Sequence, residues 1–176
     1  MLPDCGVEAR EGTTPVTFRE IFHDTYPALV RYARRMAGDP DAAEDVVQEA
    51  FVRLLDGDVR GESQRLRGWL FTTVTNLLRD RARVAANRSR LLAAQAPATS
   101  SPPEAAGEAE RQERIRRVRE ALECLDERDR TLLLLREEGF SYRELAGEVG
   151  VQPGSVGTLL ARARQRFRDR LTEETP

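Results

Sequence analysis

The chain has 176 residues, of which 40% are apolar and 33% are charged, and its formal net charge is −2. This composition is typical of a globular protein with one ordinary domain or two small ones. No apolar run reaches the length of a membrane span, and the first residues lack the charged-then-apolar order of a signal peptide, so we expect a cytoplasmic protein without membrane insertion.

Residue types that form catalytic centres and metal sites are sparse. His23 is the only histidine, and the two cysteines, Cys5 and Cys124, have neither the spacing nor the context of a zinc site. The sequence contains no nucleophile elbow and no phosphate-binding loop. We therefore predict no catalytic residue, no metal and no cofactor.

Charge is divided along the sequence although the net value is small. Residues 39–62 contain eight acidic residues and two arginines, whereas residues 64–90 contain seven arginines and one aspartate. Such a division indicates two different partners, one of which is a polyanion.

The N-terminal part begins with residues 1–16, which show no periodicity and are interpreted as a disordered leader. Apolar side chains, Phe18 and Phe22 among them, then recur at helical spacing as far as Met36. Pro27 lies inside this pattern and is expected to kink or divide the helix, because proline lacks the backbone N–H that a helix interior uses.

A second helix is predicted over residues 43–55, after a turn in which Asp41 is expected to cap it. Its apolar residues form a single stripe, as in a helix that packs one side against a core. The outer side of this helix carries Asp45, Gln48, Glu49 and Val52.

A long basic helix is predicted from about Arg65 to Leu92, with Trp69 among its core contacts. Residues 95–107 are rich in alanine, proline, serine and threonine and cannot bury a core. We therefore predict an all-α fold of two small helical domains joined by a flexible linker. The expected ranges are 17–92 for the first domain, 93–109 for the linker and 110–172 for the second domain.

The segment from Ser141 to Ala161 has the pattern of a helix-turn-helix. Ser141 and Glu144 form a capping box, Gly150 supplies a turn conformation, and Pro153 suits the first turn of a new helix. An arginine-rich stretch follows, which favours DNA binding. The alternative is a helical hairpin that packs and binds nothing.

A resemblance to a known family rests on three stretches in this order: AEDVVQEAFVRLL at 43–55, RGWLFTTVTNLLRDRAR at 67–83, and residues 121–167 with the helix-turn-helix. Together they resemble a bacterial RNA polymerase sigma factor of the extracytoplasmic-function (ECF) group in the sigma-70 family. The resemblance implies a promoter-specificity subunit that binds core RNA polymerase and promoter DNA and catalyses no reaction. It also implies a helical anti-sigma factor as a partner.

In this family the acidic helix of the first domain docks on a coiled coil of the polymerase β′ subunit, and the β subunit is also contacted. The resemblance therefore makes the outer side of the second helix the polymerase-binding face, with Asp45, Gln48, Glu49 and Val52 as candidates. Without the resemblance, the simplest interpretation of these residues is a solvated outer face.

The basic helix resembles the segment that recognises and opens the minus-ten promoter element. Opening needs cations that hold the DNA backbone and a site that captures an unstacked base. Asn76 has the amide donor and acceptor for a base edge, and Trp69 is interpreted as a core residue with an edge role. The candidate minus-ten residues are Arg67, Trp69, Asn76, Arg79 and Arg83.

The second domain resembles the reader of the minus-thirty-five element, with the helix from Pro153 in the major groove. Ser155, Thr158 and Arg162 are expected along its base-reading face. Arg143, on the preceding helix, and Arg166 are expected to contact phosphates.

Five residues depart from the family pattern, and one of them is Leu66, which stands where an aromatic side chain is common. Gly157 and Leu159 stand where many relatives carry Lys or Arg in the recognition helix, so this chain's promoter preference is expected to be its own. Gly157 also indicates close backbone approach to DNA or a marginal helix. Thr72 and Thr75 stand where family members often carry a basic residue.

Two rival functions remain open on the sequence alone. A stand-alone helix-turn-helix regulator would dimerise and bind duplex DNA without polymerase. A DNA-processing enzyme would need carboxylates or a nucleophile that converge on a scissile phosphate, and the acidic helix supplies no obvious metal site.

Overall fold

The computed structural model describes residues 17–37, 39–57, 59–91 and 106–173, and within these ranges all regular structure is α-helical. This confirms the predicted fold class. No described helix is long and apolar enough to cross a membrane. The helices are α1 (Phe18–Ala37), α2 (Pro40–Asp56), α3 (Ser63–Leu91), α4 (Ala106–Glu123), α5 (Glu127–Glu137), α6 (Tyr142–Val149) and α7 (Pro153–Glu173).

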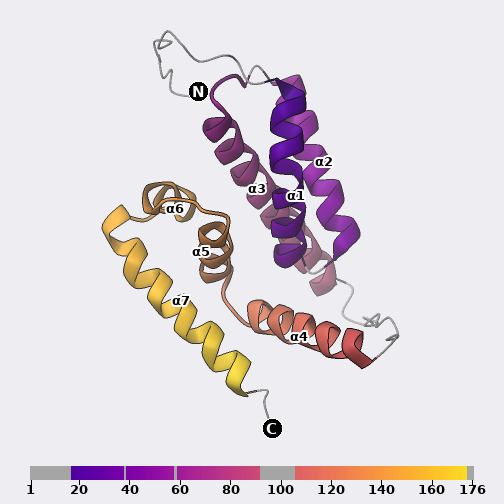
Figure 1. Cartoon of the computed structure of the whole chain (residues 1–176), viewed down its shortest axis with the longest axis vertical. Coiled ribbons are helices and arrows are strands. Elements are labelled where there is room, and N and C mark those ends of the chain that lie inside the picture. Colours follow the sequence, from indigo (N-terminus) through magenta and orange to yellow (C-terminus); the bar gives the residue numbers. More distant parts are fainter. Residues whose placement is uncertain (1–16, 38, 58, 92–105, 174–176) are drawn as a thin grey trace.

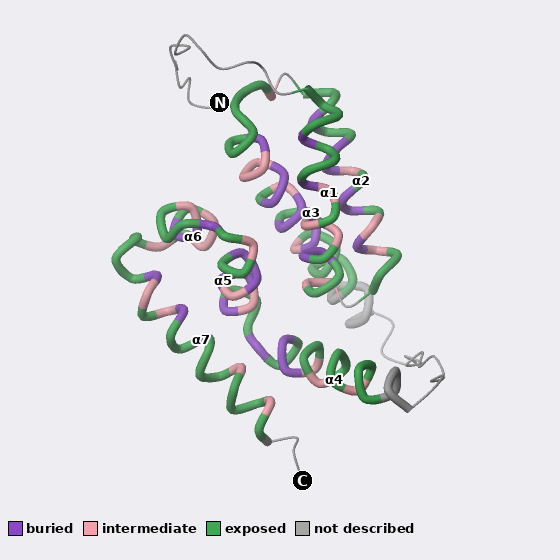
Figure 2. Tube along the Cα trace, in the orientation of Figure 1, coloured by how far each residue is buried: buried purple, intermediate pink, exposed green. Residues whose placement is uncertain are grey.

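Helices α1, α2 and α3 pack side by side and form what we call the first module (Figure 1). Their buried faces meet at side chains such as Leu29 on α1, Val47 on α2 and Leu70 on α3, all fully buried. Ala33 and Ala50 are also fully buried, and their small side chains let the helices approach closely. Figure 2 shows the buried positions along the inner faces of these helices and the exposed ones outside.

Helix α1 is continuous through Pro27, so the expectation that proline would divide it is wrong. A proline at this position removes the hydrogen bond to the carbonyl of His23, four residues earlier. Both His23 and Pro27 are exposed, so water can satisfy that carbonyl. The cap of α2 also differs from the expectation, because Asp39 rather than Asp41 is the capping residue and its carboxylate accepts from the Asp41 N–H.

Helices α4 to α7 form what we call the second module, in which α7 packs against α4, α5 and α6 (Figure 1). The predicted helix-turn-helix signals are confirmed: Ser141 and Glu144 form a complete capping box, and Gly150 ends α6 in the left-handed conformation with φ of 69°. Pro153 begins α7. Leu145 on α6 and Leu160 on α7 are buried where the two helices meet the core.

The two modules pack against each other and share one hydrophobic core. Helix α5 contacts α1, and Phe140, between α5 and α6, packs on α3. Helix α4 begins at Ala106, inside the range expected to be linker. Residues 1–16 and 92–105, which hold the expected leader and most of the expected linker, lie outside the described residues.

The left-handed turn between α6 and α7 leads to a stability prediction. Neither Gly150 nor Gly154 has any atom within 4 Å of an added Cβ, but only Gly150 has a positive φ. Gly150→Ala should therefore lower the free energy of unfolding by about 1 kcal/mol, the cost of a left-handed alanine. Gly154→Ala, the matched control inside α7, should leave it unchanged or raise it. Denaturant titration measures both values, and equal changes would contradict the assignment of the strain to the Gly150 backbone.

Candidate nucleic-acid interface

The acidic outer face of α2 is open to solvent. Asp45, Gln48 and Val52 are exposed and Glu49 is half-buried, so the structure brings the four predicted polymerase-binding residues onto one side of one helix. Arg81 of α3 lies beside this face, 3.5 Å from the Glu49 carboxylate and 4.0 Å from that of Asp45. This face is thus acidic, with Val52 as an apolar residue within it. No described part of the second module packs on it.

An exposed aromatic edge lies next to this face, and the sequence pattern did not reveal it. Phe18 and Phe22 follow the helical period of the core, but they are 39% and 40% exposed. The Phe22 ring stacks on Tyr26 with the centroids 4.8 Å apart and lies 4.9 Å from the ring of Phe51 on α2. Together with the exposed Leu55, these rings form an apolar rim of the kind that marks a protein contact surface.

The five candidate minus-ten residues on α3 fall into two groups. Asn76 and Arg83 are exposed, and Arg83 pairs with Asp80 one turn away at 2.9 Å. Trp69 is half-buried and packs against the core. Arg67 and Arg79 are also half-buried, and both guanidinium groups are already engaged by the second module.

The Arg67 guanidinium lies against two aromatic rings that also contact each other. Its central carbon is 4.9 Å from the ring centroid of Phe71 on its own helix and 4.8 Å from that of Phe140 on the second module. It also donates a hydrogen bond to the backbone carbonyl of Glu138. Cation–π contacts of this kind stabilise most where the cation has lost part of its water, so Arg67 contributes to holding the modules together.

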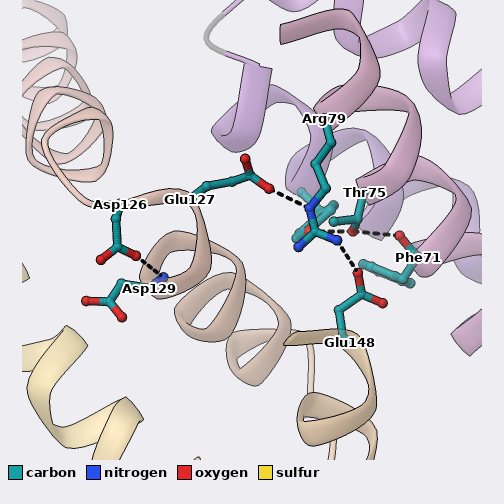
Figure 3. A network of polar contacts seen from close by, with 8 residues as sticks. Phe71, Thr75, Arg79, Asp126, Glu127, Asp129 and Glu148 are labelled. Carbon is teal, nitrogen blue, oxygen red and sulfur yellow. Dashed lines mark hydrogen bonds and ion pairs between the residues drawn. The ribbon is translucent and has the colours of Figure 1, made fainter. Parts of the chain in front are cut away.

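The Arg79 guanidinium reaches from α3 between two carboxylates of the second module (Figure 3). It donates to Glu127 at the start of α5 and lies 3.3 Å from the Glu148 carboxylate on α6. Glu148 also accepts a hydrogen bond of 2.8 Å from the Thr72 hydroxyl. Burial raises the pKa of Glu148 above its ordinary value, and the contacts with Thr72 and Arg79 oppose that shift.

A buried hydroxyl contact lies beneath this ion pair. The Tyr32 hydroxyl on α1 and the Thr75 hydroxyl on α3 are 2.7 Å apart. Thr75 donates its one proton to the Phe71 carbonyl at 2.8 Å, so Tyr32 is the donor to Thr75. Burial raises the pKa of Tyr32 well above its ordinary range, which keeps the phenol protonated.

The expected base-reading face of α7 is open to solvent. Ser155, Thr158 and Arg162 are all exposed and recur at the spacing of one helical face, and Arg143 on α6 is exposed as well. The surface is not covered by any other helix of the described chain. Five residues of the second module are expected to contact the minus-thirty-five element. The structure brings four of them together on its open surface: Arg143, Ser155, Thr158 and Arg162.

Arg166, which is expected to contact phosphate, forms an internal ion pair. Its guanidinium donates to the buried carboxylate of Asp129 and lies 3.4 Å from that of Asp126. Asp126 caps α5 by accepting from the Asp129 N–H at 2.8 Å. Arg166 thus ties the recognition helix to the start of α5.

Gly157 and Leu159, which depart from the family pattern, are both half-buried. Leu159 is half-buried and packs against the core, so it is a packing residue. A Cβ on Gly157 would sit 3.5 Å from the Tyr142 ring, an ordinary contact distance. The promoter preference expected from these two positions stays a prediction.

A groove of about 670 Å³ on the second module was not expected from the sequence. Its floor is apolar, with Leu122, Leu133 and Phe167, and arginines such as Arg136 and Arg164 stand at its edge. This combination suits an amphipathic helix that carries acidic residues. Among the described residues, no group of three or more His, Cys, Asp or Glu side chains is placed to hold a metal ion.

Comparison of the sequence with known families matches residues 21–88 to "Sigma-70 region 2" and residues 115–167 to "Sigma-70, region 4". The ECF RNA polymerase sigma factor SigL of Mycobacterium tuberculosis is 30% identical over 161 residues, which cover 88% of this chain and 89% of SigL. SigE of Mycolicibacterium smegmatis is 31% identical over 84% of this chain but only 58% of SigE. SigI of M. tuberculosis is 33% identical to this chain, and the matched region covers 88% of this chain and 55% of SigI. The chain thus spans little more than half the length of these two relatives.

Two solved structures share the arrangement of helices. The sigma factor RpoE of Bartonella quintana, in complex with the anti-sigma factor NepR, superimposes with a TM-score of 0.69 at 22% identity over 90% of this chain and 98% of that one. CnrH, in complex with the cytosolic domain of CnrY, superimposes with a TM-score of 0.62 at 25% identity over 90% and 89% of the two chains.

The ion pair between α7 and α5 leads to a prediction that separates packing from DNA contact. Arg166→Ala leaves the Asp129 carboxylate buried without its partner, so the free energy of unfolding should fall by about 2 kcal/mol. Arg162→Ala, the matched control on the same helix, removes an exposed side chain and should change stability by less than about 0.5 kcal/mol. Thermal or denaturant unfolding of both variants measures the difference. Equal stability of the two variants would mean that Arg166 is a surface residue and remains available to phosphate.

Proposed function

Because the chain belongs to the ECF group of the sigma-70 family, we propose that it is a promoter-specificity factor that binds core RNA polymerase and directs it to a set of promoters. The observation that carries this proposal is the coexistence of three separate surfaces on one chain: the acidic face of α2, the basic side of α3 and the open face of α7. A stand-alone regulator would use only the last of these and would leave the match to sigma-70 region 2 without a purpose.

Polymerase binding is assigned to the outer face of α2. The carboxylates of Asp45, which is exposed, and of Glu49, which is half-buried, would meet basic residues of the β′ coiled coil, and Val52 would supply the apolar contact at the centre. The arginine-edged groove of the second module is the surface that we assign to the β subunit, since an acidic amphipathic helix matches both its charge and its apolar floor.

The minus-ten element is assigned to α3. Its arginines would hold the backbone of the opened strand, and Asn76, which is exposed, would contact an unstacked base through its amide. Arg83 has only an exposed partner, Asp80, which DNA phosphate can replace at little cost. The protein would supply binding energy for strand opening and no chemical step of its own.

The minus-thirty-five element is assigned to the N-terminal part of α7, which would lie in the major groove. Ser155 and Thr158 are short and can approach base edges closely, whereas Arg162 has the reach for a guanine. Arg143 on α6 would contact the phosphate backbone beside the groove. All four side chains are exposed, which supports this assignment.

An anti-sigma factor is proposed as the regulatory partner, and the site of action is the cytoplasm, where core polymerase works. Two solved structures that share the helix arrangement support this proposal. RpoE is bound to the anti-sigma factor NepR, and CnrH is bound to the cytosolic domain of CnrY. The exposed rim of Phe18, Phe22 and Leu55 beside the α2 face offers an apolar surface for it.

The proposed function is tested by in vitro transcription with purified core RNA polymerase on a pool of bacterial promoters. The full chain should form a holoenzyme and select defined start sites. Glu49→Arg should weaken polymerase binding about tenfold without loss of helicity, because it places a cation on the acidic docking face. Asp24→Arg, an equal charge change on the exposed side of α1, is the matched control. The proposal would be refuted if the wild-type chain formed no holoenzyme and selected no start sites.

Asn76→Ala separates strand opening from polymerase binding. Core binding should be unchanged, because Asn76 lies on α3 away from the α2 face, whereas open-complex formation should fall about tenfold with the loss of a base contact. Permanganate footprinting measures the opened bases, and co-purification measures core binding. Loss of core binding with normal opening would instead place Asn76 in the polymerase interface.

A further inference from the structure

Arg81 lies between Arg79 and Arg83 in the sequence but faces a different part of the structure. It follows the buried Leu77 and Leu78 by four and three positions, so it extends the side of α3 that packs within the first module. Arg79 and Arg83 are each two positions from Arg81, which places them on the opposite side of the helix. The side chain of Arg81 therefore lies over α2.

The Arg81 guanidinium spans the outer face of α2. It donates a hydrogen bond of 3.1 Å to the Ala42 carbonyl, and its nitrogens lie 4.0 Å from the Asp45 carboxylate and 3.5 Å from that of Glu49. These three residues of α2 are spaced three and four positions apart, so they follow one line along the helix. One cation thus reaches both of the carboxylates that we assign to polymerase binding.

The Glu49 carboxylate lies between two cations. Its other oxygen accepts a hydrogen bond of 2.6 Å from Arg53, four positions later on α2. The side chains of Arg81 and Glu49 are 41% and 39% exposed, so an incoming partner can reach both. A basic group of the polymerase that approaches Glu49 therefore meets two guanidinium groups of its own sign, and it must displace one of them or bind beside it.

The ion pairs of Arg81 are partly exposed, and this decides what they can do. Exposed ion pairs contribute little to folding, because water and salt weaken them. They do alter the electrostatic potential that a charged partner meets, and this potential affects the rate of association. The contacts of Arg81 therefore matter more for partner binding than for stability.

We propose that Arg81 is an internal counter-charge of the polymerase-binding face, which engages the Asp45 and Glu49 carboxylates and so lowers the affinity of this chain for core RNA polymerase. The proposal rests on the function proposed above, because it concerns the same face of α2. It adds a residue on a different helix that sets the affinity of that face. Arg81 acts through the two carboxylates, so it does not need to touch the polymerase itself.

The counter-charge is tested by binding of the labelled full chain to purified core RNA polymerase without DNA, measured by fluorescence anisotropy and stopped-flow mixing. Arg81→Ala should tighten binding about threefold, mainly through faster association, and the gain should shrink as salt is raised. Arg81→Lys keeps the charge and should bind as the wild type does. In a Glu49→Gln background, Arg81→Ala should gain less, because the nearer of its two carboxylates is already neutral.

The matched control is Arg65→Ala, which removes the same charge from an exposed position of the same helix. Arg65 lies about 24 Å from Arg81 along the helix axis, beyond the range of an exposed charge at physiological salt, so core binding should change little. Circular dichroism verifies that each variant is folded. If Arg81→Ala does not fold, Arg81→Gln replaces it, since glutamine is neutral and keeps a donor for the Ala42 carbonyl.

Three outcomes would overturn the counter-charge: weaker or unchanged core binding by the folded neutral variant, an equal gain in Arg81→Lys, or an equal gain in Arg65→Ala. Weaker binding would show that Arg81 instead holds the two carboxylates in the geometry that the polymerase needs. The wild-type chain separates this result from the proposed function. If it does not bind core polymerase, both proposals fail, whereas wild-type binding without a gain in the neutral variant refutes the counter-charge alone.

Discussion

The packing of Phe140 against α3 is the contact on which the arrangement of the whole chain depends. Phe140 lies between α5 and α6, and its ring meets Phe71 on one side and the Arg67 guanidinium beside it. Because this ring is buried, the hydrophobic cores of the two modules become continuous at this point. The ion pairs of Arg79 with Glu127 and Glu148 lie at the edge of the same contact, where their geometry is fixed by the packing beneath them.

This single contact affects the proposed functional surfaces of the chain differently. The outer face of α2 and the N-terminal part of α7 are exposed, whereas Arg67 and Arg79 of α3 contact the second module. The threonines at positions 72 and 75, which depart from the family pattern, have different roles: Thr72 donates to Glu148 of the second module, whereas Thr75 accepts from the buried Tyr32 within the first module. Thr75 is fully buried, so a basic side chain at position 75 would have to be buried as well, which is unfavourable.

Much of the candidate site could be predicted because it depends on helical periodicity alone. The spacing of Asp45, Gln48, Glu49 and Val52 already sets them on one side of α2, and the capping box at Ser141 with the turn at Gly150 already sets the start and direction of α6 and α7. The arginines were less predictable. A guanidinium group in a sequence carries no sign of its partner, and Arg166 binds Asp129 while Arg67 and Arg79 bind residues far along the chain. The exposure of Phe18 and Phe22 was not predicted for a related reason, since a periodic pattern shows which residues share a face without showing what covers that face.

The sequence by itself determined in outline the three helices of the first module, the capping box at Ser141, the helix-turn-helix and membership of the sigma-70 family, because these features rest on contacts between residues three or four positions apart and on motif order. The tertiary structure decided how the modules meet and therefore which charges are available. Residues such as Arg79 and Glu148 are 69 positions apart, and only the folded chain brings them to 3.3 Å. A polar side chain becomes either a free DNA contact or half of an internal ion pair according to burial and neighbours, and both of these are properties of the packed structure.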